Sequence, residues 1–111
     1  MTVDIVIVNW NSAECLRRCI HSLSSWVDDV NEVGSVIVFD NASTDGSAQR
    51  LRNIEKLTVY NSDKNLGFAA ACNYCANVGR GKYILFLNPD TIVDKPESVL
   101  EPIARDRKSV V

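Results

Sequence analysis

Hydrophobic residues gather in four short runs along the chain, and polar turn residues separate these runs. The runs cover residues 3–8, 36–40, 57–60 and 83–87. An apolar run of about four to eight residues with turn residues on both sides is typical of a strand that is buried on both faces. The pattern therefore predicts four strands, and those at residues 36–40 and 83–87 are expected to be buried on both faces.

The segment after the first run repeats its apolar residues with a helical period, which predicts a helix over residues 13–25. Asn11 is expected to be its N-cap, with Glu14 as the capping-box partner. His21 lies next to the apolar stripe of this helix and is expected on the surface. The stripe, at positions i, i+3, i+4 and i+7, consists of Leu16, Cys19, Ile20 and Leu23.

Two more helices are expected before the fourth run. Asp45 is a candidate cap for a short helix that runs to Arg52. Gly67 opens an alanine-rich helix, Phe68–Val78, and the glycines within residues 79–81 stop it.

A last helix is expected to start at Asp94, and Pro102 should end or kink it. Strands therefore alternate with helices along the chain. This order indicates βαβ units with right-handed crossovers and a mostly parallel sheet with flanking helices. The predicted fold class is α/β, in a single domain that covers residues 1–111.

The composition is that of a small acidic domain. The 111 residues are 46% hydrophobic, and they carry a net charge of −2 with a pI of about 5.3. This charge balance argues against nucleic acid as a partner. The one basic cluster that is evident in the sequence, residues 105–108, contains an acid and is expected to be a solvated tail.

No apolar run approaches the roughly 20 residues that a membrane helix needs, and Asp4 interrupts the position of a signal sequence. A cytoplasmic location is therefore expected. The polar stretch before Ser109 contains no evident closing element, so we expect the chain to be a truncated, N-terminal part of a longer protein. The longer protein is expected in the cytoplasm or at the inner face of the membrane.

The four cysteines form two pairs, Cys15 with Cys19 and Cys72 with Cys75. The second pair has the C-x-x-C spacing of redox and zinc sites. Both pairs, however, have the spacing of one helix face, where cysteine acts as a small apolar residue. Buried thiols are the favoured interpretation, and a four-cysteine zinc site, a redox role and disulfides are the alternatives.

Polar loops follow three of the predicted strands, at residues 9–12, 40–45 and 88–90. The carboxyl ends of parallel strands meet at one edge of a sheet, and ligands of open α/β sheets bind just beyond this edge. Asn and Asp are also ordinary turn residues, which explains any one loop. Their presence in all three loops favours a ligand site, with the carboxylates of Asp40 and Asp90 at the ends of two strands.

Four segments of the chain carry motif-like sequences. They are Val8-Asn9-Trp10-Asn11, Phe39-Asp40-Asn41-Ala42-Ser43-Thr44-Asp45-Gly46-Ser47, Asn65-Leu66-Gly67-Phe68-Ala69 and Leu87-Asn88-Pro89-Asp90-Thr91. In this order and at this spacing the set resembles the family 2 glycosyltransferases, and most closely their rhamnosyltransferase-like branch in bacteria. The resemblance spans residues 3 to about 95. It implies a GT-A fold, a Rossmann-like sheet that binds a nucleotide-sugar donor in its first half.

The resemblance also implies a role for each matching position. Asp40 would accept a hydrogen bond from the ring N–H of the donor's pyrimidine base. Asp90 would be the metal-binding acid of the family's D-x-D element, in which Asn88 replaces the first acid. Trp10 would be a wall for the base, with core packing as the alternative. The positions implied in nucleotide binding are Asn9, Trp10, Asn11, Asp40, Asn41, Asp45, Asn65, Gly67, Phe68 and Asn88.

The metal requirement follows from the reaction that the resemblance implies. Sugar transfer leaves a nucleoside diphosphate, and a divalent ion that bridges both phosphates stabilises the negative charge that builds on it. Mg²⁺ and Mn²⁺ prefer oxygen ligands, and they bind through one or two carboxylates together with phosphates. Asp90 is therefore sufficient as the protein's own carboxylate for Mg²⁺ or Mn²⁺. A simple turn carboxylate after Pro89 is the alternative.

Two features depart from the family pattern. Residues 69–72 offer no polar side chain to a phosphate. The carboxylate base of the inverting members, which removes the proton of the acceptor hydroxyl, is expected beyond residue 111. No residue of this chain matches that base, and Asp94 is better explained as a helix cap.

The leading hypothesis is an inverting glycosyltransferase that moves a sugar from a dTDP- or UDP-linked donor to a saccharide or lipid-linked acceptor. The alternative is a non-catalytic module that binds nucleotide or forms a homodimer through an exposed strand edge. A nucleotidyltransferase is disfavoured because residues 9–12 contain neither glycine nor lysine for a phosphate loop. A dinucleotide-binding dehydrogenase is disfavoured because the G-x-G-x-x-G motif is absent after the first strand.

Overall fold

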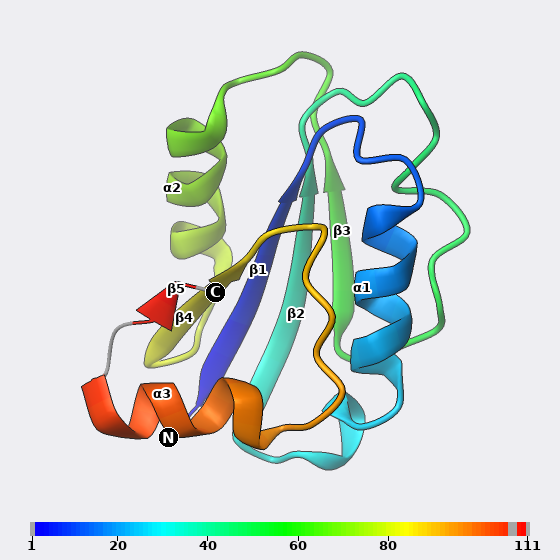
Figure 1. Cartoon of the computed structure of the whole chain (residues 1–111). Helices are drawn as coiled ribbons and strands as arrows, with labels where there is room; N and C mark the ends of the chain where they lie inside the picture. Colours follow the sequence, from blue (N-terminus) through cyan, green and yellow to red (C-terminus); the bar gives the residue numbers. More distant parts are fainter. Residues whose placement is uncertain (1, 107–108, 111) are drawn as a thin grey trace.

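The computed structural model describes residues 2–106 and 109–110. A five-stranded parallel sheet in the order β3-β2-β1-β4-β5 forms its centre, with helices on both faces (Figure 1). The strands are β1 (Val3–Asn9), β2 (Val33–Asp40), β3 (Leu57–Asn61), β4 (Tyr83–Leu87) and β5 (Ser109–Val110). The helices are α1 (Cys15–Ser24), the 3-10 helix η1 (Val27–Asp29), α2 (Phe68–Val78) and α3 (Glu97–Asp106). The predicted α/β class is confirmed.

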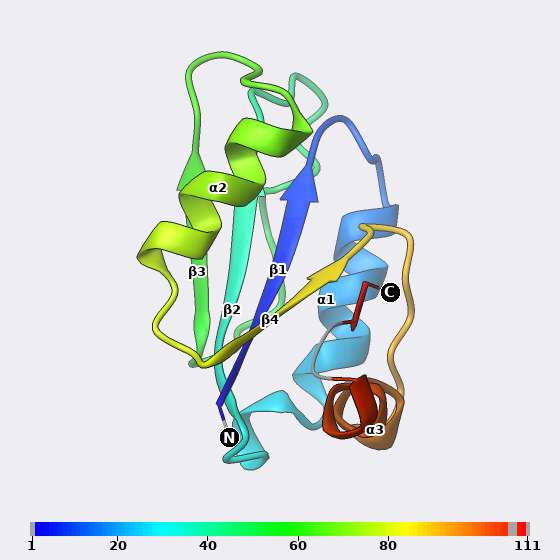
Figure 2. The same cartoon turned by 90° about the vertical axis from the view of Figure 1, so that its left-hand side faces the viewer.

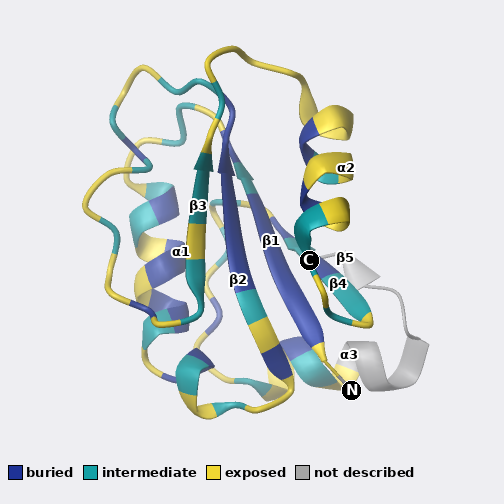
Figure 3. Cartoon of the chain, turned by 180° about the vertical axis from the view of Figure 1, so that it is seen from behind, coloured by how far each residue is buried: buried dark blue, intermediate teal, exposed yellow. Residues whose placement is uncertain are grey.

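The two faces of the sheet have separate cores. Helices α1 and α3 cover one face and α2 covers the other, as the view from the side shows (Figure 2). The α1 face holds the larger core, which includes Ile5, Leu16, Ile20 and Leu85. On the other face α2 buries only Ala71 and Cys75, and most of its surface is exposed (Figure 3).

The central strand β1 explains the continuous apolar runs in the sequence. It pairs with β2 on one side and with β4 on the other, so both of its edges and both of its faces are covered. Its one buried charge is Asp4, which is 2% exposed. The Asp4 carboxylate accepts hydrogen bonds from the Ser35 hydroxyl (2.6 Å) and the Gly81 amide (2.7 Å). Strand β2 begins at Val33, which pairs with Val3 of β1, upstream of the predicted start.

Helix α2 and strand β4 have the predicted bounds, but the predicted cap of α1 is wrong. Helix α1 begins at Cys15, and its N-cap, Glu14, makes no capping hydrogen bond with its side chain. Asn11 has a positive φ of 45°, and its side-chain oxygen accepts a hydrogen bond from the Thr44 amide (2.8 Å). Asn11 therefore joins two loops, and Glu14 pairs with Arg17 instead of closing a capping box.

The predicted short helix from Asp45 to Arg52 is also wrong. No helix occurs between β2 and β3, which are both fully within the described residues. Arg50 has a positive φ of 57°, which a right-handed helix does not allow. The Asp45 carboxylate accepts hydrogen bonds from the amides of Ser47 and Ala13 (both 2.9 Å) and so stabilises a turn that contacts the β1 loop.

The C-terminal part differs from the prediction in two ways. Helix α3 begins at Glu97 rather than at Asp94 and continues past Pro102 to Asp106. Proline removes one helical hydrogen bond, which the turns on either side tolerate here. Strand β5 then pairs with β4 and closes the sheet where no element was expected. Of the predicted basic tail, residues 107–108 lie outside the described part of the chain.

The two cysteine pairs lie on opposite faces of the sheet, because Cys15 and Cys19 belong to α1 and the other pair belongs to α2. A single four-cysteine zinc site is therefore excluded, and all four thiols are free. Buried thiols are confirmed for Cys19 and Cys75. Burial raises the pKa of Cys19 to about 12, with a smaller contribution from the charge of Asp90. Burial also raises the pKa of Cys75 to about 11.

Among the described residues, no helix is both long enough and apolar enough to cross a membrane.

Candidate functional site

Asn9 anchors the carboxyl edge of the sheet. Its side chain is fully buried at the end of β1, directly beside Asp40 at the end of β2. The Asn9 side-chain nitrogen donates to Asp40 Oδ1 (3.0 Å) and to the Ser47 hydroxyl (2.8 Å). Its side-chain oxygen accepts a hydrogen bond from Ser12. Because all of these bonds stay within the protein, Asn9 acts as a positioning residue for Asp40.

The two oxygens of Asp40 are used unequally. Oδ1 accepts hydrogen bonds from Asn9 and from the Ser43 hydroxyl (2.6 Å). Oδ2 accepts one long hydrogen bond, from the Ser43 amide at 3.3 Å. The side chain is 7% exposed. Oδ2 is therefore the oxygen that retains acceptor capacity.

The loop after β1 is tied to the loop after β2 by several more hydrogen bonds. The Asn11 amide donates to the Ser43 hydroxyl (2.9 Å), and the Ala13 amide donates to Asp45 Oδ2 (2.9 Å). Asn11 and Ala13 have positive φ values of 45° and 53°. Such strained backbone persists only where surrounding contacts hold it. Hydrogen bonds from Ser47 lower the pKa of Asp45, which keeps this carboxylate ionised.

Asn41 ties the end of β2 to the loop before α2. Its side-chain oxygen accepts a hydrogen bond from the Leu66 amide (2.7 Å), and its nitrogen donates to the Gly67 carbonyl (3.2 Å). Gly67 has a φ of 84°, a conformation that side chains other than hydrogen disfavour. Together, Asn41 and Gly67 place Phe68 at the start of α2, beside the loops of β1 and β2.

A cleft of about 550 Å³ opens at this edge of the sheet, and we call it the edge cleft. Its volume is within the range of small-molecule sites, roughly 300–1,000 Å³. Trp10 and Phe68 line it and are 57% and 63% exposed, so the core-packing alternative for Trp10 is wrong. The residues that line the edge cleft are Val8, Trp10, Ser12, Cys15, Asn41, Asn65, Gly67, Phe68, Asn88, Pro89 and Asp90.

The structure separates the predicted site residues into two groups. Trp10, Asn41, Asn65, Gly67, Phe68, Asn88 and Asp90 line the edge cleft. The other predicted residues form the hydrogen-bond network between the two loops and do not line the cleft; they are Asn9, Asn11, Asp40 and Asp45. Four lining residues were not among the predicted site residues, namely Val8, Ser12, Cys15 and Pro89. Val8 and Cys15 carry no polar signal that would have revealed them.

The edge cleft has a simple set of candidate ligands for a cation. Asp90 and Asn88 are exposed, and Asp90 is the one carboxylate among the lining residues. Within the described part of the chain, no three His, Cys, Asp or Glu side chains are grouped to hold a metal ion. One carboxylate and one amide oxygen fit an ion that also takes ligands from a bound phosphate compound. They do not fit an ion held by protein side chains alone.

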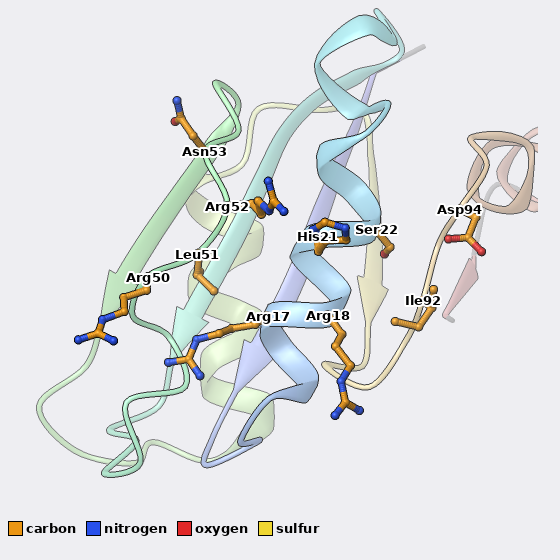
Figure 4. Close-up of a pocket in the computed structure, with 10 residues that line it drawn as sticks. All are labelled: Arg17, Arg18, His21, Ser22, Arg50, Leu51, Arg52, Asn53, Ile92 and Asp94. Carbon is orange, nitrogen blue, oxygen red and sulfur yellow. The ribbon is translucent and has the colours of Figure 1, made fainter.

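A second and larger hollow, of about 710 Å³, runs along the exposed face of α1 (Figure 4). We call it the α1 groove. Arg17 and Arg18 of α1 line it together with Arg50 and Arg52 of the loop before β3. This cluster is not evident from the sequence, because the two arginine pairs are separated by more than 30 positions.

One family model matches almost the whole chain. Residues 4–111 match the family described as Glycosyl transferase family 2. The chain is similar to the putative teichuronic acid biosynthesis glycosyltransferase TuaG of Bacillus subtilis (strain 168), with 29% identity over 105 residues. This alignment covers 89% of the chain and 40% of TuaG.

The fold is similar to that of S. aureus TarS in its crystal structure, with a TM-score of 0.72 and 23% identity. The likeness covers 95% of this chain and 19% of the TarS chain, and it confirms the expected GT-A type of sheet. The chain thus spans less than half the length of either relative. Because the family match extends from residue 4 to residue 111, the chain belongs to glycosyl transferase family 2.

Proposed function

We propose that the chain is the donor-binding part of an inverting glycosyltransferase that uses a UDP- or dTDP-linked sugar. The observation that carries the proposal is the edge cleft, which joins two exposed aromatic side chains to an exposed carboxylate. A nucleoside diphosphate needs both kinds of group, because its base is flat and apolar on its faces while its phosphates need a cation. The cleft lies at the carboxyl edge of a parallel sheet, where such ligands bind.

The base would lie between the exposed rings of Trp10 and Phe68 and the end of β2. Stacking on an aromatic side chain contributes about 1–3 kcal/mol per base. Asp40 Oδ2 would accept the ring N–H of the pyrimidine, because this oxygen holds only one long hydrogen bond. Uracil and thymine share that N–H, so Asp40 serves either base.

The diphosphate would lie between Asp90 and the start of α2. The first amides of a helix have no partner within the helix and favour a negative charge. Gly67 and Phe68 bring this helix start to the edge cleft, which compensates for the lack of polar side chains in residues 69–72. Asp90, with Asn88 beside it, would hold Mg²⁺ or Mn²⁺. When bound, the ion supplies Lewis-acid stabilisation of the leaving diphosphate.

We propose that the acceptor site and the catalytic base involve the rest of a longer protein. TuaG is described as acting in teichuronic acid biosynthesis. We extend this to a role of the longer protein in cell-envelope polysaccharide synthesis, with a saccharide or lipid-linked acceptor at the inner face of the membrane. A relation to the rhamnosyltransferase-like branch is part of the same proposal. Inversion requires a carboxylate base, which the rest of the protein would supply.

The second candidate is a non-catalytic module that binds nucleotide or dimerises. The observation in its favour is β3, which lies at the edge of the sheet and has no buried residue. An open edge of this kind can pair with a second copy of the chain. A dimer in solution together with no nucleotide binding would favour this candidate.

Thermal unfolding with UDP or dTDP, each with and without Mn²⁺, tests the proposed function. A ligand at 100 times its Kd adds about 2.7 kcal/mol, and each kcal/mol raises Tm by roughly 4–8 °C in a domain of this size. We expect a metal-dependent rise that Asp90→Asn abolishes. Asp63→Asn is the matched control, because Asp63 is exposed and lies outside the edge cleft, and it should keep the rise. No rise with either nucleotide would contradict the proposal.

A further inference from the structure

The α1 groove has two walls and a floor that come from distant parts of the sequence. Residues 50–53 form one wall, and Ile92 and Asp94 form the other. The exposed face of α1 lies between them (Figure 4). The α1 groove has a volume of about 710 Å³ and is larger than the edge cleft, which has about 550 Å³. A hollow of this size can hold several sugar rings or a comparable ligand.

The charge of the groove is opposite to that of the chain. The chain has a net charge of −2. Among the residues that line the groove, Asp94 is the one acid. The basic side chains of the groove are Arg17, Arg18, His21, Arg50 and Arg52. This concentration of positive charge favours an anionic ligand.

The arginines of the groove divide into one structural residue and three available ones. Arg17 donates to the carbonyls of Gln49 (3.1 Å) and Gly46 (2.8 Å), so it ties α1 to the neighbouring loop. Arg18, Arg50 and Arg52 are exposed. Among the described residues, no side-chain hydrogen bond or ion pair engages their guanidinium groups. A free guanidinium can bind a carboxylate or a phosphate with two parallel hydrogen bonds.

The backbone of the groove wall is strained where it presents Arg50. Its φ of 57° lies in the left-handed region, which is unfavourable for a residue with a Cβ. Glycine or asparagine would adopt this conformation more easily, yet the chain has arginine here. Strain of this kind gathers at ligand-binding positions.

We infer that the α1 groove binds an anionic saccharide chain through the guanidinium groups of Arg18, Arg50 and Arg52. Leu51 and Ile92 would pack against the apolar faces of the sugar rings. The inference deepens the proposed function and rests on it, because it makes the acceptor a glycan that carries carboxylate or phosphate groups. Arginine recognises both groups by the same planar geometry.

The position of the groove supports an acceptor in particular. Cys15 lines the edge cleft, and Arg18, one turn further along α1, lines the α1 groove. The segment after β4 also connects the two hollows, because Asp90 lines the edge cleft and Ile92 lines the α1 groove. A chain held in the groove would therefore lead toward the proposed donor site.

Two other anionic partners fit less well. Nucleic-acid binding domains are strongly basic overall, whereas this chain has a pI of about 5.3. An anionic membrane is flat on the scale of the groove, and its lipid headgroups would not fill a hollow between two walls. A flexible glycan fits such a hollow.

Binding of defined oligomers to the chain, without nucleotide, tests the inference. The probes are a linear oligogalacturonate, an oligomer of glycerol phosphate and a neutral maltooligosaccharide of similar length, each measured by isothermal titration calorimetry. We expect saturable binding of an anionic probe, weakened by salt, and no binding of the neutral one. The two anionic probes distinguish carboxylate from phosphate as the recognised group.

The variant Arg50→Gln/Arg52→Gln removes two positive charges from the groove. The variant should bind the anionic probe at least about tenfold more weakly, because it loses hydrogen bonds between charged groups that contribute to the binding free energy. Arg80→Gln/Lys82→Gln is the control with the same change in charge, at exposed positions outside the groove, and it should bind as the wild type does. Arg18→Gln provides an independent variant on α1, should the double variant fail to fold.

Several outcomes would overturn the inference. They are equal weakening in both double variants, equal binding of the neutral probe, binding of phosphatidylglycerol vesicles alone, and no binding of any probe. The nucleotide experiment with Asp90→Asn is read separately. Glycan binding without a nucleotide-dependent rise in Tm would contradict the proposed function but support the groove as a glycan site. A nucleotide-dependent rise without glycan binding would remove the groove alone.

Discussion

At the scale of single residues, the side-chain amides of two asparagines hold the loops at the carboxyl edge of the sheet together by hydrogen bonds. Asn9 and Asn41 are almost completely buried, and both use their amide groups within the protein. A buried amide without partners would cost free energy, so each of these side chains fixes the loops that it contacts. The resemblance had implied both in nucleotide binding. Asn9 is fully buried and does not line the cleft, whereas Asn41 lines the cleft and holds its neighbouring loop.

Asn41→Ala should therefore affect both stability and binding. The substitution leaves the Leu66 amide and the Gly67 carbonyl without their partner, which costs about 1–3 kcal/mol. The freed loop should also weaken UDP or dTDP binding at the start of α2. Urea unfolding and calorimetry would measure the two effects. Asn73→Ala, on the exposed face of α2, is the control and should change neither quantity. An unchanged unfolding free energy in Asn41→Ala would contradict this role.

At the scale of secondary structure elements, the end of α2 is fixed by the first strand. The Asp4 carboxylate of β1 accepts a hydrogen bond from the Gly81 amide, between α2 and β4. A Cβ added at Gly79 would lie 2.5 Å from Asp4 Oδ2 and 3.2 Å from the Cys75 carbonyl oxygen. Glycine is thus required here for a close approach between elements, and not for a positive φ.

Gly79→Ala should destabilise the chain by about 1–3 kcal/mol, because the added methyl group overpacks the contact with Asp4. Gly34→Ala is the matched control. A Cβ at Gly34 would meet its nearest atom, Asp4 Oδ1, at 3.5 Å, which is ordinary contact. Equilibrium urea unfolding of both variants would measure the difference. Equal unfolding free energies would show that the carboxylate shifts away without cost.

Secondary structure elements with a strong local pattern form where that pattern predicts them. Helix α2 and strand β4 have the bounds that composition and glycine positions predicted. The start of α1 was wrong because Asn11 uses its side chain in a contact with Thr44 rather than as a cap. The segment from Asp45 to Arg52 was wrong for a similar reason. A cap-like residue also stabilises a turn, and only the partner loop decides which of the two forms.

At the scale of the whole molecule, the segment that carries Asp90 is held by α1 and by Trp26. The Trp26 indole nitrogen donates to the Val93 carbonyl (2.9 Å), and the Val93 amide donates to the Ser22 hydroxyl (3.0 Å). These contacts join positions about 70 residues apart in the chain. Val93 follows Asp90, which lines the edge cleft, by three positions, and it follows Ile92, which lines the α1 groove, directly.

Trp26→Phe should loosen this segment while keeping an aromatic side chain in the core. The loss of the indole hydrogen bond leaves the buried Val93 carbonyl unsatisfied, which costs about 1–3 kcal/mol. Hydrogen exchange of the amides in residues 91–94 should become faster, and the Mn²⁺-dependent rise in Tm with nucleotide should decrease. Trp10→Phe is the control for the exchange measurement alone, because Trp10 is 57% exposed and lines the proposed base site, and the amides of residues 91–94 should exchange in it as in the wild type. Unchanged exchange in Trp26→Phe would contradict the coupling.

The local pattern of the chain was enough to predict the parallel sheet, its flanking helices and the edge at which polar loops gather. Apolar runs and helical periodicity report burial, and burial decides the fold class. The sequence also pointed to most of the residues that line the edge cleft. It did not separate them from Asn9 and Asp40, which do not line the cleft, because the same types of side chain serve turns, networks and ligands alike.

Other properties depend on contacts between segments that are distant in the sequence. The α1 groove exists because β2 and β3 bring the loop with Arg50 and Arg52 beside α1. Each arginine pair alone is an ordinary surface feature of a chain with a net charge of −2. The unequal use of the two Asp40 oxygens and the exposure of Trp10 depend on packing in the same way. Local sequence controls how each segment folds, whereas charge and shape at a site arise only when the fold brings several segments together.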